Sequence, residues 1–204
     1  MCRSVNRTIG SLISITKLAE GGFNRVLQAT FDDGYAVIAR LPYRRTVPKC
    51  YAGSSEAATL DLLHSHGVPV PKVLAYSPDC TNPVGAEYTL LEKIDGTPLG
   101  NQWFSMDNKT RVKIMRQIIN LEKRFMSIEF PASGSLYYRR DLEKSQCAVS
   151  LPGQSEIAAA NHIVIGPTAQ HEWWHQERAL LDVDRGPCIV FHPGLQAIPR
   201  LHMY

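Results

Sequence analysis

The N-terminal part of the chain alternates apolar and polar positions in short runs, and glycine-containing turns separate these runs. Residues 13–19 and 24–31 both have the pattern of a β-strand, and the sequence Glu-Gly-Gly-Phe joins them. Asp33-Gly34 is a hairpin signal, and the apolar run after it ends at Arg40. We therefore predict successive antiparallel strands with a glycine turn between the first two.

Helical spacing replaces this alternation after a loop at residues 42–53. Ser54 or Ser55 is expected to cap the helix, because a side-chain oxygen at that position accepts a hydrogen bond from the first turn. The helix is expected to end at His66-Gly67, since glycine is a common stop signal. Its alanines and leucines form an apolar face that must pack against another element.

Two more strands and a long amphipathic helix follow. The strands are predicted at residues 72–77 and 87–94. Asp107 can cap a helix over residues 108–127, and the apolar residues of this helix form a broad stripe. Residues 131–161 are mixed in pattern and rich in loops.

This order of elements predicts an α+β fold with two lobes. Residues 1–96 form an antiparallel-sheet lobe, and residues 97–187 form the beginning of a mostly helical lobe. Residues 188–204 show no usable periodicity, so we interpret them as a divergent tail. Within the second lobe, we expect a short strand at residues 162–165 and an aromatic helix at residues 170–181.

Composition and net charge exclude several classes of function. Hydrophobic residues make up 44% of the 204 residues and charged residues 20%, as in ordinary globular domains. The formal net charge is only +3 and the basic residues are scattered, so nucleic acid is not an expected partner. No apolar run approaches the ~20 residues of a membrane span, so we expect no membrane partner.

Cysteine usage and the N-terminus bear on the compartment. The odd number of cysteines, 5, and the absence of a C-x-x-C pair favour reduced thiols in an intracellular setting. Arg3, Arg7 and Lys17 precede the first acidic residue, which is typical of a weak organelle-targeting presequence and equally of an exposed terminus. We expect a mitochondrial or otherwise a cytoplasmic protein.

Three features together are suited to binding a nucleotide. They are the glycine turn, the strand that ends in a cation, and the helix whose first turn carries a carboxylate. The backbone of Gly21 and Gly22 can approach phosphates closely, because no Cβ intervenes. Arg40 would reach the same phosphates, and Glu56 would pair with Arg40 to hold it in place. Protein kinases pair a lysine and a glutamate at the same two places.

The motifs around these residues resemble the aminoglycoside phosphotransferase family, in particular its fungal group that includes altered inheritance of mitochondria protein 9. The resemblance covers roughly residues 10–187. Its segments are K-L-A-E-G-G-F-N-R-V at 17–26, V-I-A-R-L-P at 37–42, S-E-A-A-T at 55–59, and residues 68–76, 82–88, 134–138, 166–168 and 184–187.

This resemblance implies a protein-kinase-like fold that binds ATP with Mg²⁺ and transfers the γ-phosphoryl group to a hydroxyl. Val26 and Ile38 would hold the base between them, and the Glu92 carbonyl and the Ile94 N–H would meet the adenine edge. From the pattern alone, residues 90–94 are simply a buried strand with Glu92 at its exposed end. The nucleotide-binding residues that the resemblance implies are Gly21, Gly22, Phe23, Asn24, Val26, Ile38, Arg40, Glu56, Glu92 and Ile94.

Two departures from the family pattern affect the expected activity. Arg40 stands where a kinase has lysine, and arginine differs from lysine in shape and in hydrogen bonding. The 204 residues contain no H-G-D-x-x-x-x-N loop and no following metal-binding Asp, both of which phosphoryl transfer requires. We therefore assign no catalytic and no metal residue, and we interpret the chain as truncated before the catalytic loop. The expectation is weak nucleotide binding at most, without turnover.

Two alternatives remain open. One is a noncatalytic interaction fragment that binds neither ATP nor metal. Whether or not the chain binds ATP, a protein partner is expected to cover the incomplete second lobe, where the apolar face of the helix at residues 108–127 is partly exposed. The other is zinc hydrolysis through His171-Glu172-x-x-His175, a pattern in which two histidines one helical turn apart bind zinc. No third ligand follows at the usual spacing, so a packed aromatic helix is the competing interpretation of this motif.

Overall fold

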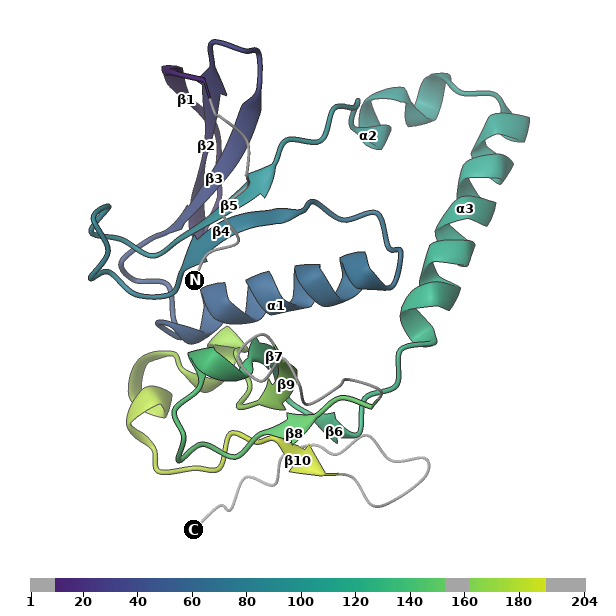
Figure 1. Ribbon diagram of the computed structural model, residues 1–204. Coiled ribbons are helices and arrows are strands. Elements are labelled where there is room, and N and C mark those ends of the chain that lie inside the picture. Colours follow the sequence, from purple (N-terminus) through teal and green to yellow (C-terminus); the bar gives the residue numbers. More distant parts are fainter. Residues whose placement is uncertain (1–9, 153–161, 190–204) are drawn as a thin grey trace.

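The computed structural model describes residues 10–152 and 162–189. A five-stranded antiparallel sheet in the order β1-β2-β3-β5-β4 forms the first lobe (Figure 1). Its strands agree with the predicted ones to within about two residues at each end. They are β1 (Leu12–Glu20), β2 (Asn24–Phe31), β3 (Ala36–Pro42), β4 (Val73–Ser77) and β5 (Tyr88–Glu92).

The strand register decides which side chains share a face of this sheet. Val26 lies opposite Arg40, Gln28 opposite Ile38, and Arg40 opposite Thr89. Because side chains alternate between the two faces of a strand, Val26, Ile38 and Arg40 belong to the same face. This face is the one that helix α1 covers, since α1 supplies the ion-pair partner of Arg40.

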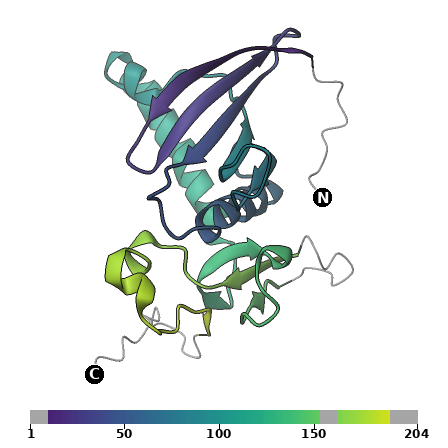
Figure 2. The ribbon, with the colours of Figure 1, turned by 90° about the vertical axis from the view of Figure 1, so that its left-hand side faces the viewer.

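Helix α1 (Tyr51–Ser65) lies between two sheets. Figure 2 shows the five-stranded sheet on one side and a smaller sheet, in the order β7-β9-β8, on the other. The small sheet consists of β7 (Ser135–Tyr138), β9 (Ile163–Gly166) and β8 (Val149–Ser150). The α1 helix of the first lobe is therefore held in part by the second lobe.

The start of α1 corrects the sequence prediction. The helix begins at Tyr51, ahead of both predicted caps, and Cys50 occupies the cap position without a side-chain cap hydrogen bond. Ser54 is buried within the helix instead. The aromatic ring of Tyr51 explains the earlier start, because it packs against the rings of Tyr137 and Trp174 at centroid distances of 5.9 and 5.1 Å.

The main hydrophobic core joins α1 to the small sheet. Its buried residues come from positions far apart in the sequence, so it crosses the predicted boundary at residue 96. They are Ala57, Ala58, Leu62, Tyr138, Leu151, Ile163 and Ile165. A second cluster on the other face of the small sheet comprises Tyr137, Leu142 and Val164.

Polar side chains add a second connection between the lobes. The Tyr138 hydroxyl donates to the Asp61 carboxylate on α1, and the Tyr76 hydroxyl donates to Asp141 at 2.7 Å. Arg140 donates to the Tyr76 oxygen at 2.8 Å and stands over the Tyr138 ring, 4.4 Å from its centroid. Burial raises the pKa of Tyr138, and its hydrogen bond to Asp61 raises it further.

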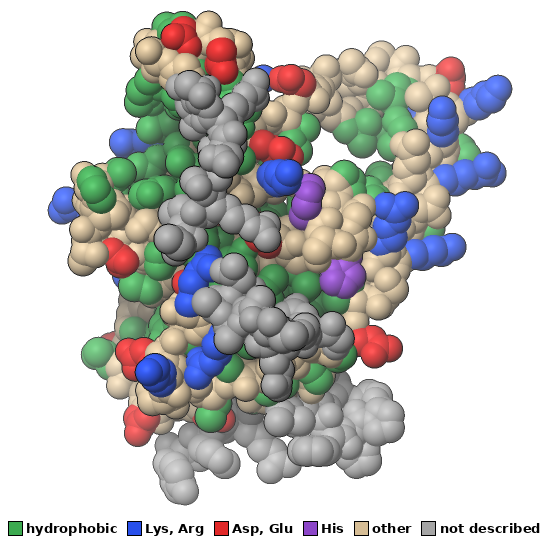
Figure 3. Space-filling view, in the orientation of Figure 1, with side chains coloured by type: hydrophobic (Ala, Val, Ile, Leu, Met, Phe, Trp, Pro, Cys, Tyr) green, Lys and Arg blue, Asp and Glu red, His purple; other side chains and the backbone are tan. Residues whose placement is uncertain are grey.

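The α3 helix stands away from both sheets. After the short helices α2 (Leu99–Gln102) and η1 (Trp103–Ser105), α3 (Asn108–Met126) begins where predicted, with the Asp107 carboxylate accepting from the Thr110 N–H at 2.6 Å. None of its residues is buried. Figure 3 shows an opening between α3 and the rest of the molecule. Its apolar stripe is exposed at Val112, Met115, Ile119, Phe125 and Met126.

The region from residue 131 onward contains more structure than its sequence pattern indicates. The η2 turn (Arg139–Asp141) follows β7, and β6 (Ala132–Ser133) pairs with β10 (Cys188–Ile189). The predicted strand at residues 162–165 is confirmed as β9. The predicted tail beyond Ile189 and the basic residues Arg3 and Arg7 lie outside the described residues.

The predicted aromatic helix at residues 170–181 is wrong. Two short 3₁₀ helices, η4 (His171–Trp173) and η5 (Gln176–Leu180), replace it, and Gln176 has a φ of 52°. Arg185 explains the break, because its guanidinium donates to the carbonyls of Trp173, Arg178 and Leu181 at 2.7–3.4 Å and so binds acceptors that a helix would use. Within residues 10–152 and 162–189, no helix is long and apolar enough to cross a membrane.

Candidate functional site

A cavity of about 190 Å³ opens beside Arg40, at the point where the first lobe meets the second. The glycine turn between β1 and β2, the end of β3, the start of α1 and the start of β5 surround it. Among the described residues of the second lobe, His171 alone belongs to its lining. The lining residues are Phe23, Asn24, Arg40, Pro42, Thr46, Val47, Ala52, Gly53, Glu56, Glu87, Tyr88, Thr89 and His171.

Arg40 and Glu56 form an ion pair inside this cavity, as predicted. Both side chains are about one-third exposed, at 34% and 29%, so solvent reaches the pair. A guanidinium has five N–H donors in a fixed fork, and one carboxylate occupies only part of that set. Arg40 can therefore hold Glu56 and still offer donors to an anion in the cavity.

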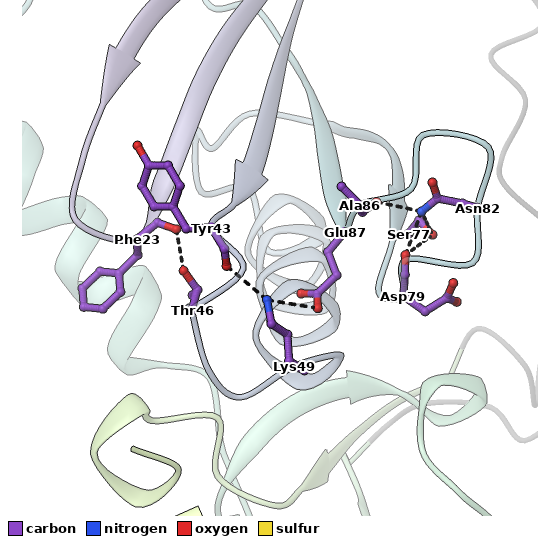
Figure 4. Close-up of polar contacts among 9 residues, drawn as sticks. All are labelled: Phe23, Tyr43, Thr46, Lys49, Ser77, Asp79, Asn82, Ala86 and Glu87. Carbon is purple, nitrogen blue, oxygen red and sulfur yellow. Dashed lines mark hydrogen bonds and ion pairs between the residues drawn. The ribbon is translucent and has the colours of Figure 1, made fainter. Parts of the chain in front are cut away.

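The 43–49 loop fastens the glycine turn. The Tyr43 N–H and the Thr46 hydroxyl both donate to the Phe23 carbonyl, at 3.0 and 2.7 Å, and Figure 4 shows Thr46 directed at this carbonyl. Within the turn itself, the Gly21 N–H donates to the Asn24 carbonyl at 3.0 Å. The turn is thus a braced element whose position depends on residues well outside the glycine motif.

Glu20 supplies the other brace of the turn. Its carboxylate accepts from the Tyr43 hydroxyl at 2.6 Å, from Lys17 at 3.0 Å and from Arg25 at 3.3 Å. These contacts, with the Tyr43 hydrogen bond first, lower the pKa of Glu20 from its ordinary 4.5 to about 2. Because this pKa is depressed, the ionised carboxylate favours the folded state above pH 4.5, and the contribution is lost as the pH falls toward 2.

We expect the Glu20 carboxyl group to titrate near pH 2 in an NMR pH titration of the folded chain. Tyr43→Phe should move the midpoint upward, because it removes the hydroxyl that contributes most to the shift. A Glu20 midpoint near 4.5 in the wild-type protein would contradict the bracing contacts.

Glu87 borders the cavity from the start of β5. Lys49 approaches its carboxylate at 3.6 Å and also donates to the Tyr43 carbonyl at 3.1 Å (Figure 4). Asn82 shapes the turn before Glu87, since its amide donates to Ser77, Asp79 and Ala86 at 2.7–2.9 Å. The side chain of Glu87 is only 10% exposed, so it is a fixed carboxylate of the cavity wall.

The H-E-x-x-H motif does not have the geometry of a zinc helix. His171 lies in η4, His175 precedes η5, and their rings are 4.8 Å apart between centroids. No α-helical turn spaces them as the motif requires. In the part of the chain that the structure describes, no three His, Cys, Asp or Glu side chains are grouped to hold a metal ion. His171 instead contacts Phe23 of the glycine turn, with 5.2 Å between ring centroids.

The structure brings only some of the predicted nucleotide residues into the cavity lining. Phe23, Asn24, Arg40 and Glu56 line it. Gly21 and Gly22 belong to the turn beside it, and Val26 and Ile38 share the sheet face that leads away from it. Glu92 ends β5, and Ile94 lies beyond the strand with 56% of its surface exposed.

Sequence reasoning missed nine of the thirteen residues that line the cavity, Thr46, Glu87 and His171 among them. A loop brings Thr46 to the site and a turn brings Glu87 there, so no periodic pattern places either residue. His171 was considered only as a zinc ligand.

Comparison with known proteins identifies the family. The model of the phosphotransferase enzyme family matches residues 14–192. The chain belongs to this family. Both the antiparallel-sheet lobe and the mixed α+β architecture are those of its kinase-like fold.

Curated relatives extend the comparison within fungi. A subtelomeric hrmA-associated cluster protein of Aspergillus fumigatus is 42% identical over 177 residues, which are 86% of this chain and 33% of the relative. Altered inheritance of mitochondria protein 9, mitochondrial, is 30% identical over 196 residues in Candida tropicalis and 29% over 194 residues in Candida albicans. These matches cover 89% and 88% of this chain and 32% and 31% of the relatives. The chain thus spans about a third of the length of the relatives that it matches.

Proposed function

We propose that this chain binds ATP or a related nucleotide on the sheet face that carries Arg40, with the phosphates in the cavity. The observation that carries this proposal is the Arg40–Glu56 ion pair inside a cavity that the glycine turn borders. In kinase-like enzymes a cation paired with a helix carboxylate contacts the nucleotide phosphates. Membership of the phosphotransferase enzyme family supports the same interpretation.

The size of the cavity limits which part of the nucleotide it receives. Its volume of about 190 Å³ is below the ~300–1,000 Å³ of pockets that enclose a whole drug-sized ligand. The phosphate chain therefore occupies the cavity in this proposal, and the base lies outside it. Val26 and Ile38 on the same sheet face would contact the base, and the chain after β5, with Glu92 and Ile94, would meet its edge.

Magnesium enters this proposal with the nucleotide. The two carboxylates in the cavity lining, Glu56 and Glu87, each face a cation, Arg40 and Lys49. Mg²⁺ usually keeps several waters and is held by one or two carboxylates together with substrate phosphates. We derive no magnesium ligand from the described residues and assign the ion to the phosphates as a counter-ion.

We propose binding without turnover for these 204 residues. They contain no H-G-D-x-x-x-x-N loop to supply a base and a metal ligand. Phosphoryl transfer to a hydroxyl acceptor is the activity we propose for the longer family members. For the compartment we propose the mitochondrion, because relatives carry the word mitochondrial in their names.

The second candidate function is a noncatalytic interaction module. The apolar stripe of α3 favours it, because Val112, Met115 and Ile119 are 44–52% exposed along one helix. Exposed apolar surface of this kind is typical of an interface. This candidate needs no nucleotide, so one measurement separates the two.

We expect Mg·ATP to raise the thermal midpoint of the purified chain. A ligand that binds only the folded state stabilises it by about 2.7 kcal/mol at 100 times its dissociation constant. Differential scanning fluorimetry with increasing Mg·ATP measures this, and Mg²⁺ with sulfate at matched ionic strength is the control. No shift at millimolar Mg·ATP would overturn the nucleotide proposal and favour the interaction module.

A further inference from the structure

His171 reaches the candidate nucleotide cavity from the other lobe. Within the part of the chain that the structure describes, every other lining residue belongs to the stretch from Phe23 to Thr89, whereas His171 lies in η4 of the second lobe. Its ring contacts the Phe23 ring at a centroid distance of 5.2 Å, so the histidine meets the tip of the glycine turn across the cavity mouth. The cavity is therefore closed on one side by a residue far away in the sequence.

The segment that presents His171 is anchored. The Trp174 indole N–H donates to the Thr168 carbonyl at 2.7 Å, and the Trp174 ring lies 5.1 Å from the Tyr51 ring on α1. The Arg185 guanidinium stands over the Trp174 ring, 4.3 Å from its centroid. These contacts tie η4 to α1, the helix that also carries Glu56, so His171 and the Arg40–Glu56 pair share one support.

The charges around the cavity leave a specific role for this imidazole. From the first lobe, Arg40 is paired with Glu56 and Lys49 with Glu87, so each fixed cation already faces an acid. A nucleotide triphosphate adds several negative charges to this balanced set. Histidine is the side chain that can take up a compensating proton between pH 5 and 8.

We propose that His171 binds the phosphates from the second lobe and that nucleotide binding is coupled to its protonation. This inference rests on the proposed function and names a regulation of the same site by pH. An anion close to the imidazole favours the charged form. Binding therefore takes up a proton, and the affinity rises as the pH falls from 8 to 6.

The other charged groups around His171 set the size of the effect. Arg40, Glu56 and Glu87 line the cavity together with His171, so one fixed cation and two carboxylates share the cavity with it. On its own segment, the His175 ring lies 4.8 Å away, and Glu172 and Arg178 are close in sequence. Two adjacent imidazolium groups would repel, so the proposal assigns at most one proton to the two rings.

The test compares the dissociation constants of Mg·ATP at pH 6 and pH 8 for the wild type and two variants. His171→Gln removes both the charge and the aromatic contact, and His171→Phe keeps a ring against Phe23 without the charge. We expect the wild type to gain about tenfold in affinity from pH 8 to pH 6 relative to either variant, which corresponds to one pKa unit of coupling. Comparing variants with the same nucleotide cancels the titration of the phosphates themselves.

Calorimetry in buffers of different ionisation enthalpy supplies an independent readout. On binding at pH 7 the wild type should take up about half a proton, the most that a coupling of one pKa unit allows, and both His171 variants should take up markedly less. His64→Gln, at an exposed position near the end of α1, is the matched control and should behave as the wild type. Equal pH dependence and proton uptake in the wild type and in His171→Phe would overturn the inference.

Inorganic tripolyphosphate separates this inference from the proposed function. It presents the phosphate chain without a base, so it reports on the cavity alone. Tripolyphosphate binding with His171-dependent proton uptake, but no detectable Mg·ATP binding, would sink the nucleotide proposal and keep the phosphate site. Mg·ATP binding without His171-dependent proton uptake would overturn this inference and keep the nucleotide proposal. If neither probe bound at any pH, both the inference and the proposed function would be overturned.

Discussion

Replacing Leu62 with alanine is expected to lower the free energy of unfolding by about 2 to 5 kcal/mol. Leu62 is 3% exposed and lies on α1, where the helix packs against the small sheet beneath it. The truncation removes apolar contacts and leaves a cavity between elements of both lobes, which a close-packed core cannot fully collapse to fill. Urea unfolding followed by circular dichroism measures the loss as a lower midpoint.

Leu180→Ala is the matched control for this prediction. The same side chain is 87% exposed there, so the change should stay within about 0.5 kcal/mol of the wild type. The contrast tests the position of α1 between two sheets rather than the hydrophobicity of leucine. Similar losses in both variants, or none in Leu62→Ala, would mean that the helix does not form the core between the lobes.

The elements that the sequence predicted well are those whose signals are local. Gly34 adopts a φ of 79°, so the Asp33-Gly34 turn needs glycine at that position and identifies the hairpin from two residues. Asp107 caps α3 through a near neighbour in sequence, because its carboxylate accepts a hydrogen bond from the Thr110 N–H. In both cases the sequence neighbours that specify the structure are also its contacts.

The elements that were mispredicted depend on partners distant in sequence. Tyr51 starts α1 because it packs on Tyr137 and Trp174, which only the folded chain brings near. Arg185 breaks the expected aromatic helix by binding backbone carbonyls of residues 173–181. No pattern within a single window of sequence carries that information.

The residues of the candidate site also differ in whether local sequence signals predict them. Arg40 and Glu56 were predicted to pair because a strand end and a helix start define their places, and the structure confirms the pair. The wall residues Thr46, Glu87 and His171 come from a loop, a turn and the other lobe. The periodicity of the sequence does not place such residues. The ion pair of the cavity could therefore be predicted from the sequence, but the residues that form its walls could not.

Arg40→Ala is expected to abolish the stabilisation of the chain by Mg·ATP, a loss of about 2.7 kcal/mol at a ligand concentration of 100 times the wild-type dissociation constant. The guanidinium is the cation of the cavity lining, and its removal also leaves Glu56 facing the phosphates without a partner. Arg40→Lys should keep part of the shift, because the charge stays while the two-pronged contact is lost.

A double-mutant cycle with Glu56→Gln separates binding from folding. If Glu56 acts by orienting Arg40, then Glu56→Gln weakens Mg·ATP binding in the wild-type background and has little further effect after Arg40→Ala. Arg116→Ala, an exposed arginine on α3, should leave the nucleotide shift intact. If Mg·ATP raised the thermal midpoint of Arg40→Ala as much as that of the wild type, the nucleotide would bind elsewhere. If the losses of nucleotide stabilisation were additive in the double mutant, Glu56 would not position Arg40. Because the fluorimetry records each variant with and without nucleotide, a change confined to the liganded state is the signature of the site.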